Sequence, residues 1–244
     1  MKKIETPLKP AGRGPFAIDL LQPSISDKVL NIGCFDGGLE YHRLLGKVKE
    51  FRGIDMNRDA INKASVWATS LLGSKDIFQV AAAESIPFED STFDKILCLD
   101  TFEHVQDERK TAAEIFRVLK PGGVLVLSVP HDFLNFLDPD ELTRSMRNVV
   151  RKYIKKTPPL DHPKHRHYSE AQLRDFFKDF EFDIVHKCGT PVFWSLAMLY
   201  TAVGLPQAMV DKAAKITAPL ENLDYRVGLP TGFNIMIRVR KSKG

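Results

Sequence analysis

Residues 28–38, KVLNIGCFDGG, decide the fold: an apolar run of strand length enters a turn rich in glycine, and a helical pattern follows. Glycines at 33, 37 and 38 let the backbone turn tightly and approach a bound molecule without Cβ clashes. A dinucleotide-binding turn reads G-x-G-x-x-G, and Phe35 stands where its second glycine would be. The turn therefore predicts a ligand site at a strand end and argues against an NAD enzyme.

The same alternation continues along the chain. Apolar runs indicate strands at 28–33, 51–55, 76–81, 93–99, 123–130, 180–187 and 233–240. Helical periods lie at 37–48, 57–71, 107–119 and 169–179, the last opened by a Ser169-x-x-Gln172 capping box. Crossover segments between the first five strands make those strands parallel, and their Val/Ile/Leu-rich runs suit strands covered on both faces. This rhythm predicts a doubly wound α/β sheet.

Length and composition set bounds. A chain of 244 residues that is 43% hydrophobic can form one large α/β domain. We therefore expect a single domain over 1–244, with insertions at 131–168 and 189–231 that form a substrate lid or cap. The net charge of +4, from 35 basic and 31 acidic residues, permits an anionic partner without requiring one.

Cysteine usage and the first residues bear on location. Cys34, Cys98 and Cys188 have no metal-ligand spacing, and MKKIETPLKP lacks the apolar stretch of a signal peptide. We expect a reduced, cytoplasmic protein without a structural metal.

Functional residues are expected where strands end, because ligands of such sheets bind at the carboxyl ends of the strands. Asp55 ends the second strand in FRGIDMN, about twenty residues after the glycine turn. A carboxylate there can accept both hydroxyl protons of a ribose. The alternative is that Asp55 is only the N-cap of the following helix.

Two later stretches complete a recognisable series: residues 80–107, VAAAESIPFEDSTFDKILCLDTFEHVQD, and residues 114–130, EIFRVLKPGGVLVLSVP. With VLNIGC and GID, they resemble the class I S-adenosylmethionine-dependent methyltransferases, especially the type 11-like group acting on small molecules, lipids and glycans. The resemblance covers about residues 26–130. It implies a Rossmann-like, doubly wound seven-stranded sheet, mostly parallel with an antiparallel last strand. It also implies methyl transfer to a small-molecule, glycan or lipid-linked acceptor, and we expect transfer to oxygen.

The resemblance assigns cofactor contacts to individual positions. The turn residues lie along the methionine part of the cofactor, Asp55 holds the ribose, Met56 lies beside the adenine, and Asp100 forms the floor of the site. Ala83 and Glu84 fall in the adenine-reading loop. The turn residues are Gly33, Cys34, Phe35, Asp36 and Gly37.

Two positions depart from the family pattern. Ala82 stands where the family usually has an aspartate that binds the adenine amino group. Phe35 replaces a glycine, which S-adenosylmethionine tolerates because it brings no pyrophosphate to the turn. The Phe35 ring forms either an apolar wall of the substrate pocket or part of the core.

Histidines at strand ends are candidates for the general base that a hydroxyl or amine acceptor needs. His131, directly after the fifth strand and followed by Asp132, is the first choice, and His104 after the fourth strand is the alternative. His165 and His167 in HPKHRHYS are either catalytic or part of a packed loop. Their His-x-His spacing has no further ligand nearby, so no metal is expected.

The insertions bear on the acceptor. Residues 142–156 predict a basic amphipathic helix, and residues 192–205 form an apolar run of 14 residues, too short to span a bilayer. We expect both to form a lid, and peripheral membrane contact is the alternative. The basic helix is the only support for a nucleic-acid methyltransferase, which we do not expect. A third possibility, suggested by Phe35 and Ala82, is a non-catalytic protein that keeps the fold.

Overall fold

One sheet of seven strands organises the molecule. A computed structural model of the chain describes residues 7, 12–74, 76–132, 166–189, 207–229 and 232–243. Its strands are β1 (Lys28–Ile32), β2 (Glu50–Asp55), β3 (Phe78–Val80), β4 (Phe93–Leu99), β5 (Leu119–Pro130), β6 (Phe180–Cys188) and β7 (Asn234–Lys241). Their order across the sheet is β3-β2-β1-β4-β5-β7-β6. Strands β1 to β5 pair in parallel, and β7 is antiparallel to both β5 and β6. The predicted Rossmann-like fold is confirmed.

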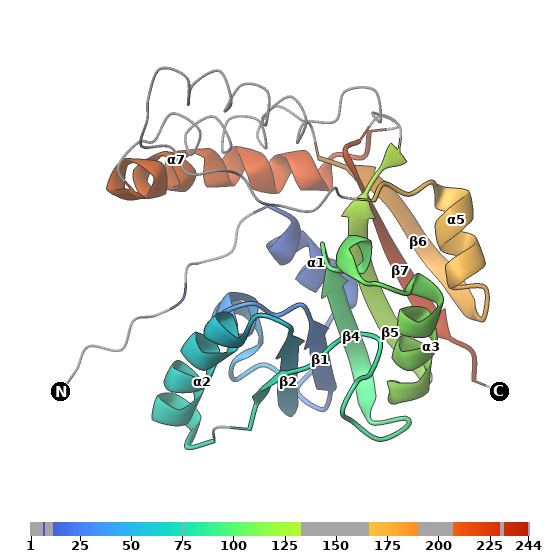
Figure 1. The fold of residues 1–244 in the computed structure, drawn as a ribbon. Coiled ribbons are helices and arrows are strands. Elements are labelled where there is room, and N and C mark those ends of the chain that lie inside the picture. Colours follow the sequence, from blue (N-terminus) through green and yellow to red (C-terminus); the bar gives the residue numbers. More distant parts are fainter. Residues whose placement is uncertain are drawn as a thin grey trace.

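Helices cover both faces of this sheet (Figure 1). They are α1 (Arg13–Leu21), α2 (Arg58–Leu72), α3 (Glu108–Val118), α5 (Glu170–Phe176) and α7 (Gln207–Arg226), with a π-helical turn η1 (Glu40–Leu44) and a 3-10 turn η2 (Phe102–His104). Apolar side chains of α1 and α2 form one core with one face of the sheet, and those of α3 and α5 form a second core with the other face. The capping box at Ser169 and Gln172 is present and opens α5.

The sheet ends that carry the site are buried and rigid. In β1 the last four of five residues are buried, and in β5 the last eight residues are buried. Strands buried on both faces are rich in Val, Ile and Leu, as these two strands are, with Asn31 and Ser128 as buried polar exceptions. The loops that follow them therefore start from fixed positions.

The largest differences from the sequence-based boundaries occur at two elements. Strand β5 begins at Leu119 rather than at 123, because Leu119 pairs with Phe93 before Lys95 pairs with Val124. The intervening LKPGG segment bulges out through Gly122, whose φ is +77°. The helix expected at 37–48 is mainly the short π-helical turn Glu40–Leu44.

Two helices were not predicted. The N-cap of helix α1 is Gly12, which has no side chain to form a capping hydrogen bond. The usual sequence signal for the start of a helix is therefore missing. Helix α7 contains Pro219, a residue that ordinarily ends a helical pattern. Figure 1 shows α7 lying across the end of the sheet at which β4 and β5 finish, and α1 packs against α7, β4 and β5.

Several expectations fall outside the described residues: the basic helix at 142–156, the apolar run at 192–205, and His165. Within the ranges that the structure describes, no helix is both long and apolar enough to cross a membrane.

Candidate active site

A pocket of about 370 Å³ opens at the carboxyl ends of β1, β2 and β4. Its polar lining residues are Arg13, Asp55, Glu84, Asp100, Thr101 and His104. Because β1 lies between β2 and β4, the pocket runs from Asp55 across the glycine turn to Asp100. Two strand spacings separate these carboxylates, which is roughly 10 Å.

The glycine turn is held against β2. The backbone amides of Gly33 and Cys34 both donate to the Ile54 carbonyl, at 2.8 and 3.1 Å. Gly33 has φ +78°, and a Cβ there would lie 1.9 Å from Thr101 Oγ1. Gly37 has φ +73°, and its Cβ would lie 2.7 Å from the Phe78 ring. Both positions therefore require glycine for conformation and for space.

Phe35 lies in the same turn with φ +50°, and 58% of it is exposed. Its side chain lines the pocket, so the alternative that Phe35 fills the core is wrong. Cys34 is buried, and Asp36 Oδ1 accepts a hydrogen bond from the Gly38 amide. Neither Cys34 nor Asp36 is among the residues that line the pocket.

Asp55 braces the turn from β2. Its Oδ2 accepts from the Phe35 amide at 2.9 Å, and its Oδ1 accepts from the Asn57 amide at 2.8 Å. The N-cap of α2 is Asn57, whose side chain accepts from two amides of the first turn, so the N-cap alternative for Asp55 is wrong. A carboxylate oxygen accepts more than one hydrogen bond, so Asp55 retains capacity toward the pocket.

The opposite end of the pocket contains an ion pair that sequence reasoning missed. Asp100 Oδ1 accepts from Ser128 Oγ at 2.8 Å, and Asp100 Oδ2 lies 2.5 Å from Arg13 Nη1. Burial lowers the pKa of Arg13, but Asp100 and Tyr225 outweigh burial and raise the pKa above its ordinary value. Arg13 belongs to α1 and Tyr225 to α7, far from the motif that carries Asp100, and no local pattern links them.

Glu103 is a buried carboxyl that interacts electrostatically with both members of this ion pair. Glu103 is only 3% exposed, and burial together with the nearby Asp100 raises its pKa well above the ordinary value. Its neutral form is therefore favoured, and Asp100 is the carboxylate that remains to pair with Arg13.

The loop after β3 forms the remaining wall. Ala83 and Glu84 line the pocket beside Met56. Glu84 Oε1 accepts from the Gln106 amide at 2.6 Å, which ties this loop to the one after β4. Ala82 is half-buried and is not among the lining residues.

Of the four histidines named from the sequence, the three that the structure describes lie in different environments. His104 is exposed and lines the pocket. His131 is 5% exposed, its Nδ1 lies 2.9 Å from the Gly232 carbonyl, and its Nε2 lies 3.5 Å from Asp132 Oδ1. The His167 ring packs on Phe233 with ring centres 6.4 Å apart. His131 and His167 are not among the lining residues.

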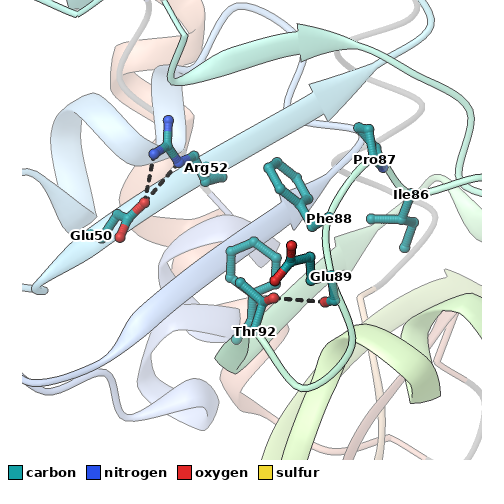
Figure 2. Close-up of a pocket in the computed structure, with 8 residues that line it drawn as sticks. Glu50, Arg52, Ile86, Pro87, Phe88, Glu89 and Thr92 are labelled. Atoms are coloured by element: carbon teal, nitrogen blue, oxygen red, sulfur yellow. Dashed lines mark hydrogen bonds and ion pairs between the residues drawn. The ribbon is translucent and has the colours of Figure 1, made fainter.

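A second hollow, of about 490 Å³, lies near the amino ends of the strands, between the start of β2 and the loop before β4 (Figure 2). Figure 2 shows Glu50 and Arg52 of β2 pointing toward one another, opposite Ile86, Pro87 and Phe88. Arg117 donates to the carbonyls of Ile86 and Phe88, at 2.9 and 2.7 Å. The hollow is thus bordered by a surface loop with a structural role, far from the glycine turn.

No group of three or more side chains that could hold a metal occurs in the part of the chain that the structure describes.

Comparisons with known proteins agree with this geometry. Residues 30–127 match the family model described as a methyltransferase domain. The chain is 34% identical to norajmaline N-methyltransferase of Rauvolfia serpentina, over 46% of this chain and 41% of that protein. It is 26% identical to the ubiquinone biosynthesis O-methyltransferase of Thiobacillus denitrificans, over 54% of this chain and 67% of that protein. The chain spans less than half the length of several curated relatives that it matches.

Solved structures show the same fold. The YcgJ protein of Bacillus subtilis superposes with a TM-score of 0.60 and 22% identity, over 95% of this chain and 98% of that chain. The [4+2]-cyclase SpnF gives a TM-score of 0.64 at 16% identity, over 95% of this chain and 81% of that chain. Residues 30–127 therefore resemble a methyltransferase domain, and the seven-stranded sheet has the fold of these solved structures.

Proposed function

We propose that the chain transfers a methyl group to a hydroxyl of a small-molecule, glycan or lipid-linked acceptor at the pocket between Asp55 and Asp100. One observation carries this proposal: a single pocket places an available carboxylate at one end and an Arg–Asp ion pair at the other. S-adenosylmethionine, when bound, supplies a methyl group on a sulfonium that is already an activated leaving group.

The residues present fit that cofactor. Asp55 can accept the two ribose hydroxyls, since both of its oxygens retain acceptor capacity. Apolar side chains between the two ends, including Ile54, Ala83 and Val105, suit an adenine ring. At the far end, Arg13 and Asp100 complement a zwitterion, because the guanidinium attracts a carboxylate and Asp100 attracts an ammonium.

The glycine turn also suits a cofactor without phosphates. A pyrophosphate would need the turn amides, but the Phe35 amide is already used by Asp55. We therefore assign the turn from Gly33 to Gly37 to the methionine part, contacted through Gly33 and Phe35, which line the pocket. We assign Met56, Ala83 and Glu84 to the adenine side.

The pocket favours His104 as the general base over His131. A base must reach the acceptor proton, directly or through one water. His104 is exposed and lines the pocket, whereas the His131 ring is buried against Gly232 and Asp132. His104 would take the hydroxyl proton of the acceptor, and bound S-adenosylmethionine would supply the methyl group. His131 and His167 then support the surrounding structure.

Helix α7 lies within 189–231, one of the two segments that we propose as a lid. The Gly12 amide donates to Asn222 Oδ1 at 2.8 Å, and Arg226 forms an ion pair with Asp19. These contacts join α7 to α1, which carries the pocket residue Arg13. We propose that 131–168 and 189–231 are insertions in one domain that cover the acceptor side of the pocket.

Relatives support a small acceptor without fixing the atom. Their names include O-methyltransferases of ubiquinone biosynthesis and of tocopherol, and N-methyltransferases of norajmaline and phosphoethanolamine. We propose oxygen as the acceptor atom; the base that the pocket offers would serve a hydroxyl or an amine, and the transfer assay separates the two.

A transfer assay with S-adenosylmethionine labelled in its methyl group tests the function against phenols, amines, sugar nucleotides and lipid-linked glycans. His104→Ala should lower turnover by roughly a hundredfold while cofactor affinity stays near the wild-type value. His131→Ala is the matched control, and a larger loss in that variant would return the role to His131. Binding of the cofactor without transfer to any acceptor class would favour a non-catalytic protein.

A further inference from the structure

Strained backbone marks the pocket. Four non-glycine residues in the described part of the chain have left-handed φ angles: Gln22, Phe35, Ser91 and Asp100. Two of these, Phe35 and Asp100, line the pocket. The conformation of Asp100 is explained by its bonds to Ser128 and Arg13. A phenyl ring can form no such bonds, and 58% of Phe35 is exposed.

The turn imposes this conformation on Phe35. Its amide donates to Asp55, and the Gly37 amide donates to the Cys34 carbonyl at 3.0 Å. Glycine would adopt the same φ without steric strain, whereas an L side chain costs stability there. Folding alone therefore favours glycine, and an exposed aromatic ring kept against that preference points to a function.

A second exposed apolar side chain lies beside Phe35. Met56 follows Asp55, lines the same pocket and is 69% exposed. Asp55, which binds the Phe35 amide, connects the two positions. Phe35 and Met56 thus form an apolar rim on a pocket whose ends are charged, and more than half of each residue is exposed in the protein alone.

We propose that Phe35 is a specificity-determining residue, whose ring contacts an aromatic or alkyl part of the acceptor, while Met56 stays on the adenine side. This inference rests on the function proposed above. The polar and charged groups of the cofactor have partners inside the pocket, at Asp55, Arg13 and Asp100, whereas the rim offers only apolar surface. An acceptor consisting only of polar groups gains nothing from that surface.

Calorimetry with S-adenosylmethionine analogues tests the inference without knowledge of the acceptor. The probes replace the transferred methyl by ethyl, propyl and butyl, so that the alkyl group extends toward the acceptor space. In the wild type, affinity should rise by two- to fourfold for each added methylene, the upper value being about that of full burial. In Phe35→Gly, the increase should disappear while affinity for S-adenosylhomocysteine changes by less than about threefold.

Ser91→Gly is the matched control, because Ser91 is also exposed and has φ +50° but lies outside the pocket lining. Both variants should keep or raise the melting temperature, by up to about 4 °C, since each removes left-handed strain. Only Phe35→Gly should lose the dependence on alkyl length.

Three outcomes would overturn the inference: the same dependence in wild type and Phe35→Gly, no dependence in the wild type, or a tenfold loss of S-adenosylhomocysteine affinity in Phe35→Gly. The last would show that the ring contacts the cofactor. A wild type that binds neither S-adenosylmethionine nor S-adenosylhomocysteine would instead reject the proposed function.

Discussion

The two ends of the pocket are built in different ways. At the Asp55 end, the glycine turn and the last residue of β2 bind one another through backbone amides within a short stretch of chain. At the Asp100 end, residues from α1, β4 and β5 meet, and Arg13 and Ser128 fix the same carboxylate. One end depends on local geometry, whereas the other depends on tertiary assembly.

This difference bears on how such a site can change. Substitutions in the turn alter the backbone that both ends share, so they should affect folding and binding together. Substitutions at Arg13 alter a side-chain partner supplied by α1, so they should affect affinity more than stability. The predictions below test this contrast, beginning with the largest expected effect.

Gly33→Ala should be the most damaging change. The new Cβ would overlap Thr101 Oγ1 in addition to the cost of a left-handed alanine, and we expect a loss of about 3–5 kcal/mol in the free energy of unfolding. Gly46→Ala is the control, because Gly46 has φ +72° with nothing within 4 Å of a built Cβ. That variant should lose only about 1 kcal/mol in urea unfolding. Equal losses would show that Thr101 does not restrict the turn.

Glu40 makes the glycine-turn region sensitive to pH. Glu40 is fully buried, its Oε1 accepts from Asn31 Nδ2 at 2.9 Å, and burial raises its pKa to about 7. Below the ordinary glutamate pKa, Glu40 is protonated in both the folded and the unfolded chain. As pH rises toward 7, the unfolded chain ionises first, so the folded state loses stability, by about 3 kcal/mol in total.

Glu40→Gln removes the titrating proton with little change of shape. Urea unfolding from pH 4.5 to 8 should show the wild type losing stability relative to this variant up to about pH 7, with a constant difference above that pH. A difference that does not vary with pH would mean that Glu40 titrates normally.

Arg13→Gln tests the tertiary end of the pocket. Loss of a charged hydrogen-bonding partner should weaken S-adenosylmethionine binding about tenfold or more in calorimetry. Arg226→Gln is the matched control. Arg226 of α7 also forms an ion pair with an aspartate of α1, Asp19, but this pair lies on the surface. Exposed ion pairs contribute about 0–1 kcal/mol, so this control should change neither affinity nor folding appreciably. Equal affinities in the two variants would remove Arg13 from the site.

Most of the fold could be predicted because its signals are local. The apolar runs marked all seven strands, and the acid after β2 marked one end of the pocket. The start of β5 was predicted four residues too late. Residues Leu119 and Phe93 pair before the bulge at 120–123, and this pairing depends on the neighbouring strand rather than on the local sequence.

The rest of the site arises from contacts between distant segments. Arg13 lies on a helix without a capping signal, and Tyr225 lies on a helix that contains a proline. The sequence therefore could not predict that either side chain lies near Asp100. The direction of Phe35 depended on a left-handed φ angle, which periodicity does not encode.

Calorimetric titration of wild type and Asp55→Ala with S-adenosylmethionine and S-adenosylhomocysteine tests the central claim most directly. Asp59→Ala is the control, because Asp59 is an exposed carboxylate in the first turn of α2, outside the pocket lining. The wild type and Asp59→Ala should bind both compounds. Asp55→Ala should bind at least about tenfold more weakly, since two charge-assisted hydrogen bonds to the ribose are lost. Equal affinity in Asp55→Ala, or no binding by the wild type, would contradict the assignment of this pocket to the cofactor.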